Sequence, residues 1–247
     1  MVNMLDTLVT DFYVNQKLTL KMDLPESRET ILDLFSRLKK EFPGLANFRR
    51  FEDELALESD ELQKAYSWFS MKGTTLRSGA VNPDDLVDAY QLHRKVLEIA
   101  PWFLSISPID IEHLELVFGF DLEAHGDRDS IVFNALMADC PLGEMVMDDE
   151  QVIESQPVIG IALEPSTNMQ AFVEVKTRTT IRERSSGIFG REPISVFLTV
   201  RHTGGIENLT DLNTRFAALA GCAERLAEER VVPNILTPIR HTILAQP

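Results

Sequence analysis

The chain has 247 residues, 44% of them hydrophobic, and a formal net charge of −15. This charge argues against nucleic acid as a general partner, because phosphate binding requires a basic surface. Two cysteines are too few for a disulfide scaffold, and no apolar run reaches membrane-spanning length. Residues 1–11 contain no Lys or Arg, so they do not resemble a secretory signal. We therefore expect a cytoplasmic globular protein that does not associate with membranes.

In chain order, the first half of the sequence predicts a strand, a helix, two or three strands and a second helix. The expected positions are 12–23 for the first strand, 25–42 for the helix, 48–57 and 66–77 for strands, and 82–100 for the second helix. Pro25 and Pro83 suit the first turn of a helix. Gly73 or Gly79 marks a turn or a bulge within the strand region.

The second half begins with the clearest periodicity in the chain, at 110–132. Apolar residues occupy every second position: Leu114, Leu116, Phe118, Phe120 and Leu122. This alternation predicts a strand with one apolar face, and the change of spacing after it predicts a helix at 128–138.

The remaining elements of the second half follow the order of the first. Strands are expected at 152–163, 169–183 and 194–202, and an amphipathic helix runs from about Asn208 to Leu226. The tail 231–247 contains Pro233 and Pro238. We expect this tail to lie extended and to add a short strand at 239–244.

The two halves also match in sequence at one place. Met22-Asp23-Leu24 corresponds to Phe120-Asp121-Leu122, and 28–32 corresponds to 128–132. Coincidence is the alternative, because strand-to-helix junctions share composition. We interpret the chain as an α+β protein with an internal duplication, in which each half has antiparallel strands and helices on one face. The halves are 1–105 and 106–230, and 231–247 is the tail.

This order of elements is similar to that of a TATA-box-binding-protein-like repeat, in which two such units form one curved sheet. The resemblance is one of topology only, since no sequence motif of that family is present. Fold alone does not carry function. Because the chain is acidic, we also do not expect it to share the DNA-binding role of that family.

The sequence contains no catalytic or metal-binding pattern. Its histidines are spread over separate predicted elements, without HExxH or paired CxxC spacing: His93, His113, His125, His202 and His241. No GxSxG motif is present, and neither Cys140 nor Cys222 lies in a catalytic signature. We therefore assign no catalytic residue, no metal and no cofactor, and we favour a protein that is not an enzyme.

A basic segment at 176–201 is the feature that most suggests binding. Its basic residues far outnumber Glu183 and Glu192, and glycines flank an apolar pair at its centre. As a regular hairpin it would present several cations on one face. We predict that it binds a partner through Arg182, Arg184, Ile188, Phe189 and Arg191. The alternative is a solvated strand whose arginines pair with nearby acids.

These features favour a non-enzymatic interaction or assembly protein, with a protein partner or self-association through a sheet edge or the basic segment. The alternative is a small-molecule-binding protein or enzyme with a pocket between helices and a curved sheet. Its polar groups would be His113, His202, Tyr90 or Arg201. Nucleic-acid binding through the basic segment is a third reading, which the net charge opposes.

Overall fold

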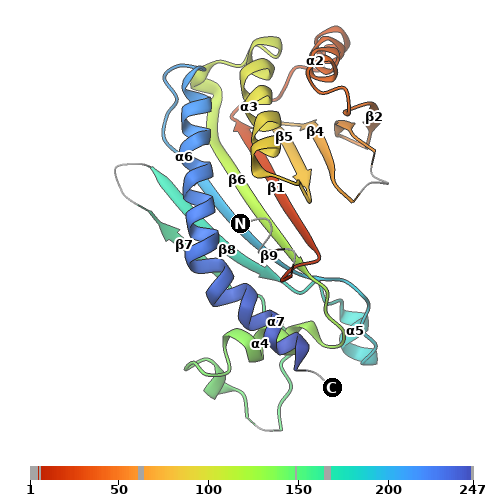
Figure 1. Ribbon diagram of the computed structural model, residues 1–247, viewed down its shortest axis with the longest axis vertical. Coiled ribbons are helices and arrows are strands. Elements are labelled where there is room, and N and C mark those ends of the chain that lie inside the picture. The colour runs from red at the N-terminus through yellow and green to blue at the C-terminus, as the bar shows by residue number, and fades with distance from the viewer. Residues whose placement is uncertain (1–4, 6, 61–63, 148, 164–167, 246–247) are drawn as a thin grey trace.

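The computed structural model describes residues 5, 7–60, 64–147, 149–163 and 168–245. In these residues, a nine-stranded antiparallel sheet forms the body of the protein (Figure 1). The strand order is β2-β3-β4-β5-β1-β6-β9-β8-β7. With helices packed against this sheet, the fold is α+β, as the sequence predicts.

The first half of the chain forms one side of the sheet and two helices. The elements are β1 (Asp11–Leu20), α2 (Arg28–Glu41), β2 (Asn47–Arg50), β3 (Leu55–Glu58), β4 (Tyr66–Lys72), β5 (Thr75–Val81) and α3 (Leu86–Phe103). β4 and β5 meet in a tight turn at Gly73, which has a φ of +52° and so takes the turn position predicted for it. α3 begins after Asp85, whose side chain accepts a hydrogen bond from the Val87 N–H.

The second half forms the other side of the sheet. After the short 3₁₀ turn η1 (Pro108–Asp110), its elements are β6 (Ile111–Leu122), α4 (Arg128–Leu136), η2 (Gly143–Met145), β7 (Val158–Ala162), β8 (Met169–Lys176), α5 (Ile181–Ser186), β9 (Ile194–His202) and α6 (Asp211–Leu226). α4 is capped by Asp127, whose carboxylate accepts from the backbone N–H groups of Asp129 and Ser130.

The halves meet at the centre of the sheet, where β1 and β6 run antiparallel. Lys17 lies opposite Glu115, and Asn15 lies opposite Val117. The alternating apolar residues of both strands point to the side on which α3 and α6 lie, and they form the core there with residues from these helices. The predicted face of Leu114 to Leu122 is this core face.

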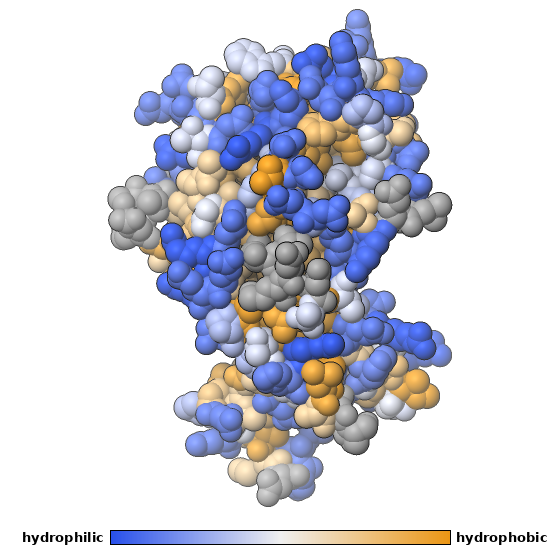
Figure 2. All heavy atoms as spheres, in the orientation of Figure 1, coloured by the Kyte–Doolittle hydropathy of each residue, from blue (hydrophilic) through white to orange (hydrophobic). Residues whose placement is uncertain are grey.

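The two faces of the sheet therefore differ, and we call them the helix face and the open face. α3 and α6 lie on the helix face (Figure 1). The view of Figure 2 shows the molecule from that side, where hydrophilic residues predominate. The open face carries the intervening residues of each strand, such as Tyr13, Asn15 and Lys17 of β1.

One buried polar chain on the helix face connects α3 to the sheet. Gln16 donates to Ser78 Oγ (3.0 Å) when its amide nitrogen is oriented toward it. Ser78 Oγ lies 2.8 Å from His93 Nδ1, and His93 Nε2 lies 3.2 Å from the Val14 carbonyl oxygen. Burial lowers the pKa of His93 to about 3. The neutral ring therefore accepts from Ser78 and donates to Val14, so this histidine has a structural role.

The structure corrects several predicted segments. The strand expected at 48–57 is the hairpin of β2 and β3, and the strand expected at 66–77 is divided by the turn at Gly73 into β4 and β5. Four strands, rather than two or three, therefore lie between α2 and α3. The strand expected at 169–183 ends at Lys176, and α5 follows because Thr180 and Glu183 form a capping box. The tail is helical rather than extended: a π-helical segment, η4 (Ala227–Leu236), continues α6 and leads into α7 (Thr237–Leu244).

Two local features allow the helical tail to contain both prolines. Pro233 lies in the wider π-helical turns of η4, and Pro238 lies in the first turn of α7, where no N–H partner is needed. Burial of Val231, Leu236 and Ile239 stabilises this arrangement.

Candidate functional site

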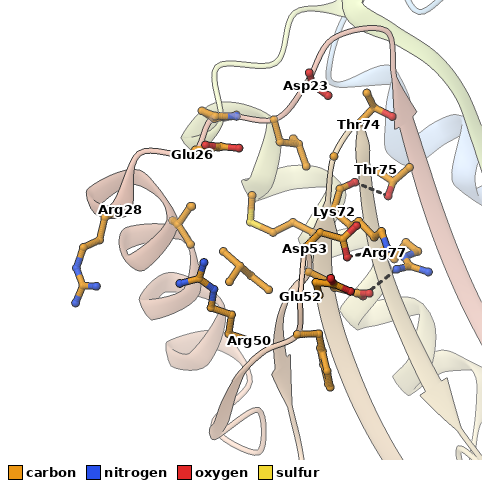
Figure 3. A pocket seen from close by; sticks show the side chains of 18 of the residues that line it. Asp23, Glu26, Arg28, Arg50, Glu52, Asp53, Lys72, Thr74, Thr75 and Arg77 are labelled. Carbon is orange, nitrogen blue, oxygen red and sulfur yellow. Dashed lines mark hydrogen bonds and ion pairs between the residues drawn. The ribbon is translucent and has the colours of Figure 1, made fainter.

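A hollow of about 1210 Å³ lies at one end of the molecule, between α2 and the β2–β3 and β4–β5 hairpins (Figure 3). α2 is held there by its buried face, in which the Phe35 ring lies 5.6 Å from the ring of Phe69 on β4. The hollow forms because three segments that are separate in the sequence meet around it: 23–32, 48–55 and 71–77.

The wall of the hollow contains both apolar and charged side chains. Leu24, Ile31 and Met71 are buried side chains that line it. Three more lining residues keep much of their surface in solvent: Leu32 (42%), Phe48 (52%) and Phe51 (50%). Exposed apolar side chains gathered in a concavity are typical of a site that binds another molecule.

Charged groups of both signs surround these apolar residues. Two ion pairs hold the wall together: Lys72 Nζ lies 2.9 Å from Asp53 Oδ1, and Arg77 Nη2 lies 2.8 Å from Glu54 Oε1. Other lining residues have no ion pair among the described residues: Arg28, Arg50, Asp23, Glu26 and Glu52. In Figure 3, Arg50 extends into the space between α2 and the strands. These groups remain available to a ligand.

A cluster of ionised groups on the open face adjoins the hollow. Its centre is the buried Glu115 carboxylate, 2.6 Å from Arg201 Nη2 and 3.3 Å from Lys17 Nζ. Burial alone would raise the pKa of Glu115, but Lys17 and Arg201 outweigh it and hold this pKa below its usual value. Burial, together with the same two cations, lowers the pKa of His113. The ring is therefore neutral at pH 7, and its 3.6 Å contact with Glu115 is not an ion pair.

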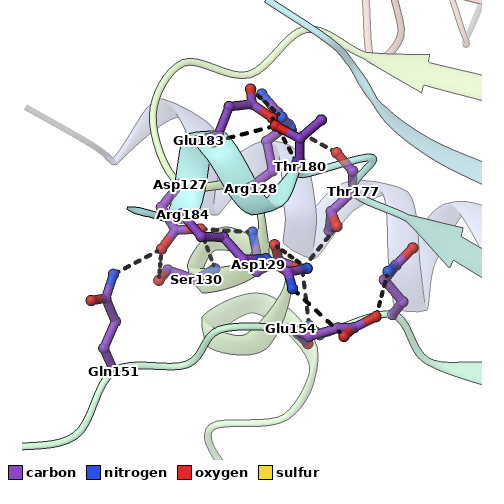
Figure 4. Close-up of polar contacts among 12 residues, drawn as sticks. Asp127, Arg128, Asp129, Ser130, Gln151, Glu154, Thr177, Thr180, Glu183 and Arg184 are labelled. Atoms are coloured by element: carbon purple, nitrogen blue, oxygen red, sulfur yellow. Dashed lines mark hydrogen bonds and ion pairs between the residues drawn. The ribbon is translucent and has the colours of Figure 1, made fainter. Parts of the chain in front are cut away.

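A second group of polar side chains lies around α4 and α5, away from the hollow (Figure 4). Arg128, at the start of α4, is fully buried. Its Nε donates to the Thr177 carbonyl (2.7 Å), Nη1 to the Gly190 carbonyl (3.0 Å) and Nη2 to Glu183 Oε1 (2.9 Å). Backbone N–H groups of Thr180 and Gly190, together with Arg128, hold the pKa of Glu183 well below its usual range. α5 is thereby fastened to α4.

The buried acid Asp129, labelled in Figure 4, extends this network. Asp129 Oδ1 accepts from the Ser155 N–H (3.0 Å) and from Thr177 Oγ1 (2.8 Å). Asp129 Oδ2 lies 3.7 Å from Arg184 Nη2, and Arg184 Nη1 lies 3.7 Å from Glu154 Oε2. The charges are paired inside the protein, so the network joins α4, α5 and the loop before β7.

The structure separates the five residues predicted to bind a partner. Arg184 turns inward to Asp129 and Glu154, whereas Arg182 and Arg191 are exposed. Ile188 is 76% exposed and Phe189 is half-buried. The expected shared face of a regular hairpin is wrong here, because α5 interrupts the strand. The exposed apolar and basic residues of this segment, which we call the tip, are Ile181, Arg182, Ile188 and Arg191.

The four polar groups of the small-molecule alternative do not converge. His113 and Arg201 meet on the open face at Glu115. Tyr90, on α3, donates to Glu224 of α6 (2.9 Å), and burial, followed by the Glu224 charge, raises its pKa. His202 is buried on the helix face, and burial lowers its pKa. Helices and sheet therefore enclose no common site for these residues.

Metal-binding clusters and membrane-spanning helices are both absent from the described part of the chain. No three His, Cys, Asp or Glu side chains in it lie close enough together to hold a metal ion. None of its helices combines the length and the apolar character needed to cross a membrane.

The residues of the hollow were missed by sequence reasoning. The one local signal is the run Phe48-Arg49-Arg50-Phe51, which places aromatic side chains beside arginines. Nothing in the local pattern shows that α2 and the β4–β5 turn come to lie against this run, because the convergence depends on long-range strand pairing.

Comparisons with known proteins add little to this geometry. No family model and no curated protein matches the chain. One similar solved structure is the crystal structure of the di-domain ARO/CYC BexL from the BE-7585A biosynthetic pathway. The two are 10% identical over 95% of this chain and 99% of that one, with a TM-score of 0.22. A likeness this weak carries no argument about function.

Proposed function

We propose that this protein is a non-enzymatic interaction protein that binds a polypeptide segment of a partner in the hollow beside α2. One observation carries the proposal. Leu32, Phe48 and Phe51 are about half exposed inside the concavity, and Arg50 reaches into the same space without an ion pair among the described residues. A partner that covers these three apolar side chains would gain roughly 25 cal/mol of binding free energy per Å² of apolar surface buried.

The charges of the hollow favour a polypeptide over nucleic acid. Asp23, Glu26 and Glu52 line the same wall as Arg28 and Arg50. A phosphate backbone would be repelled by the three carboxylates, whereas a peptide with acidic, basic and apolar side chains can match both signs. The free thiols Cys140 and Cys222 support our proposal that the protein works in the reducing cytoplasm.

The described groups with shifted pKa values are engaged in structural contacts, which supports a binding role rather than catalysis. His93 joins α3 to β1, and Tyr90 joins α3 to α6. Glu115 is neutralised by Lys17 and Arg201. Catalytic acids and bases need a proton to exchange with a substrate, and these groups face other protein atoms.

We also propose that the two halves are diverged copies of one unit with TATA-box-binding-protein-like topology. In each half the first strand pairs with the last one, β1 with β5 and β6 with β9, and the earlier strands follow outward. Two residues join β4 to β5, whereas α5 and its flanking loops join β8 to β9. In the second copy, α5 fills the space beside the last two strands and is bound there through Arg128 and Glu183. The first copy has no helix in this connection, so the equivalent space would be open.

Panning of a random-peptide phage library tests the proposed function and can be done before any partner is identified. We expect enriched peptides that combine apolar and charged residues. Phe48→Ser with Phe51→Ser, and separately Arg50→Glu, should each weaken peptide binding by about tenfold or more, because aromatic and arginine contacts carry most interface energy. Isothermal titration calorimetry measures the affinities.

The matched control is Trp102→Ser, which removes an aromatic side chain that is 71% exposed and does not line the hollow. It should leave peptide affinity unchanged. Peptides that bind equally well to the hollow variants would refute the proposal. If Ile188→Ser alone abolished binding, the tip of α5 would be the binding surface instead. A stoichiometric small molecule seen by native mass spectrometry and lost in Arg50→Glu would assign the hollow to a small ligand.

A further inference from the structure

The open face of the sheet is wide and only half-buried. Its central cross-strand row runs from Trp68 on β4 through Gly79, Asn15, Val117 and Thr199 to Phe172 on β8. Trp68, Val117, Thr199 and Phe172 all keep part of their surface in solvent. The row crosses the junction of the two halves, so the face is continuous.

Glycines flatten this face. An added Cβ at Gly79 would lie 2.4 Å from the Trp68 ring, and one at Gly119 would lie 3.1 Å from the rings of both Tyr13 and Phe197. Each of these rings is therefore laid across a glycine on a neighbouring strand, close to the backbone. Rings that lie flat in this way add little height at these positions, where a second surface can approach closely.

Charges on the open face neutralise one another. Glu115 pairs with Lys17 and Arg201 at the centre, Arg49 Nε lies 2.7 Å from Glu58 Oε2, and Lys176 Nζ lies 3.2 Å from Glu174 Oε2. The face is thus close to neutral on a chain that carries −15. Two copies of an acidic protein repel each other least where neutral surfaces meet.

The size of the face fits a dimer interface. Nine strands spaced about 4.8 Å apart, with about six residues each at roughly 3.4 Å, span about 800 Å². A stable protein–protein interface buries about 800 Å² on each partner. A second copy of the same sheet meets this requirement, and two sheets can pack face to face at a distance of about 10 Å.

We infer that the open face is a homodimer interface, on which the sheet of a second copy packs to form a two-fold sandwich. The helices of both copies then lie on the outside of the sandwich. A two-fold axis between the sheets brings residues near the centre of the face close to their own counterparts. Val117 is such a residue.

The test uses opposite charges at Val117 in the full chain, with sedimentation velocity and circular dichroism as readouts. Wild type is expected to be a dimer. Val117→Glu and Val117→Lys should each be folded monomers, because like charges meet across the axis. A mixture of the two variants should form dimers again, because opposite charges then face each other.

Ile159→Glu on the exposed sheet edge β7 is the control, and it should remain a dimer. Monomeric wild type would overturn the inference, and so would dimers that survive both Val117 substitutions or that dissociate only in Ile159→Glu. Variants that lose their circular dichroism signal are replaced by Thr199→Glu and Thr199→Arg on β9, which make the same test at a neighbouring position. Failure of the mixed sample to dimerise would overturn the inference as well.

Discussion

At the scale of single residues, the atoms around a glycine determine whether a larger side chain can replace it. Gly79 is covered by Trp68 and Asn15, and an added Cβ would approach both to 2.4 Å. Gly221, in α6, has no atom within 4 Å of the same added Cβ. The two positions are a matched pair in which the same change has opposite consequences.

We expect Gly79→Ala to destabilise the protein by about 1–3 kcal/mol, because the Trp68 ring or the strand must move. Gly221→Ala should stabilise it by about 0.5–1 kcal/mol, because alanine loses less conformational entropy in a helix. Urea denaturation measures both changes. Equal effects of the two substitutions would contradict the ring-over-glycine packing.

His93 gives the protein a defined acid sensitivity. Its pKa, lowered from 6.5 to about 3 by burial, lies below that of the unfolded chain. The neutral ring therefore stabilises the fold fully above about pH 6.5, and this contribution is lost as the pH falls toward 3. At pH 5 the loss is about 2 kcal/mol relative to pH 7.

We expect the free energy of unfolding to fall between pH 7 and pH 5, and the fall to be smaller in His93→Gln. The variant will be less stable at pH 7, since glutamine cannot replace both ring contacts. His125→Gln is the control, because His125 is exposed. Denaturant titrations at the two pH values measure the slopes, and an identical slope in wild type and His93→Gln would disprove this role.

At the scale of elements, α5 is held mainly by polar contacts. None of its residues is buried, so apolar packing contributes little. Its anchor is Arg128, which reaches the Thr177 and Gly190 carbonyls and Glu183 from α4. The position of the exposed tip thus depends on a residue about fifty positions earlier in the chain.

Arg128→Met should destabilise the protein by about 2–3 kcal/mol, because two carbonyls and a carboxylate lose their donor. Residues 177–193 should also exchange amide hydrogens faster. Arg178→Met is the matched control, since Arg178 is exposed and lies 4.0 Å from Glu192, and it should cost under about 1 kcal/mol. Hydrogen exchange by mass spectrometry follows the segment, and unchanged exchange in Arg128→Met would contradict the anchoring.

At the scale of the whole molecule, charge distribution governs association. The chain carries −15, the helix side is mostly hydrophilic (Figure 2), and the ion pairs of the open face cancel one another. Dimerisation through that face brings two strongly acidic bodies together. Their repulsion acts over a Debye length of about 30 Å at 0.01 M salt and about 8 Å at 0.15 M.

We therefore expect the dimer to tighten several-fold as salt is raised from about 0.01 M to about 0.15 M. Sedimentation velocity over a concentration series gives the dissociation constant at each ionic strength. Weaker association at the higher salt would show that attractive ion pairs across the interface dominate instead.

Much of the architecture could be predicted from local patterns. Alternation in β6 identifies its core face, and three- and four-residue spacing identifies α6. The end of the strand before α5 also has a local signal, because Thr180 and Glu183 are spaced as a capping box. The prediction of an extended tail is wrong because proline excludes only the regular α-helix interior, whereas the wider turns of η4 contain Pro233.

The sequence by itself determined the strands β1, β6 and β9, the helices α2, α3 and α6, and the acidic character of the protein, because these follow from periodicity and composition. Only the tertiary structure decided which charges meet. It buried Arg128 against α5, gathered Phe48, Phe51 and Arg50 around the hollow, and left a neutral, flat face on the sheet. Each of these features joins segments that are far apart in the chain, and long-range strand pairing, which local patterns do not specify, brings them together.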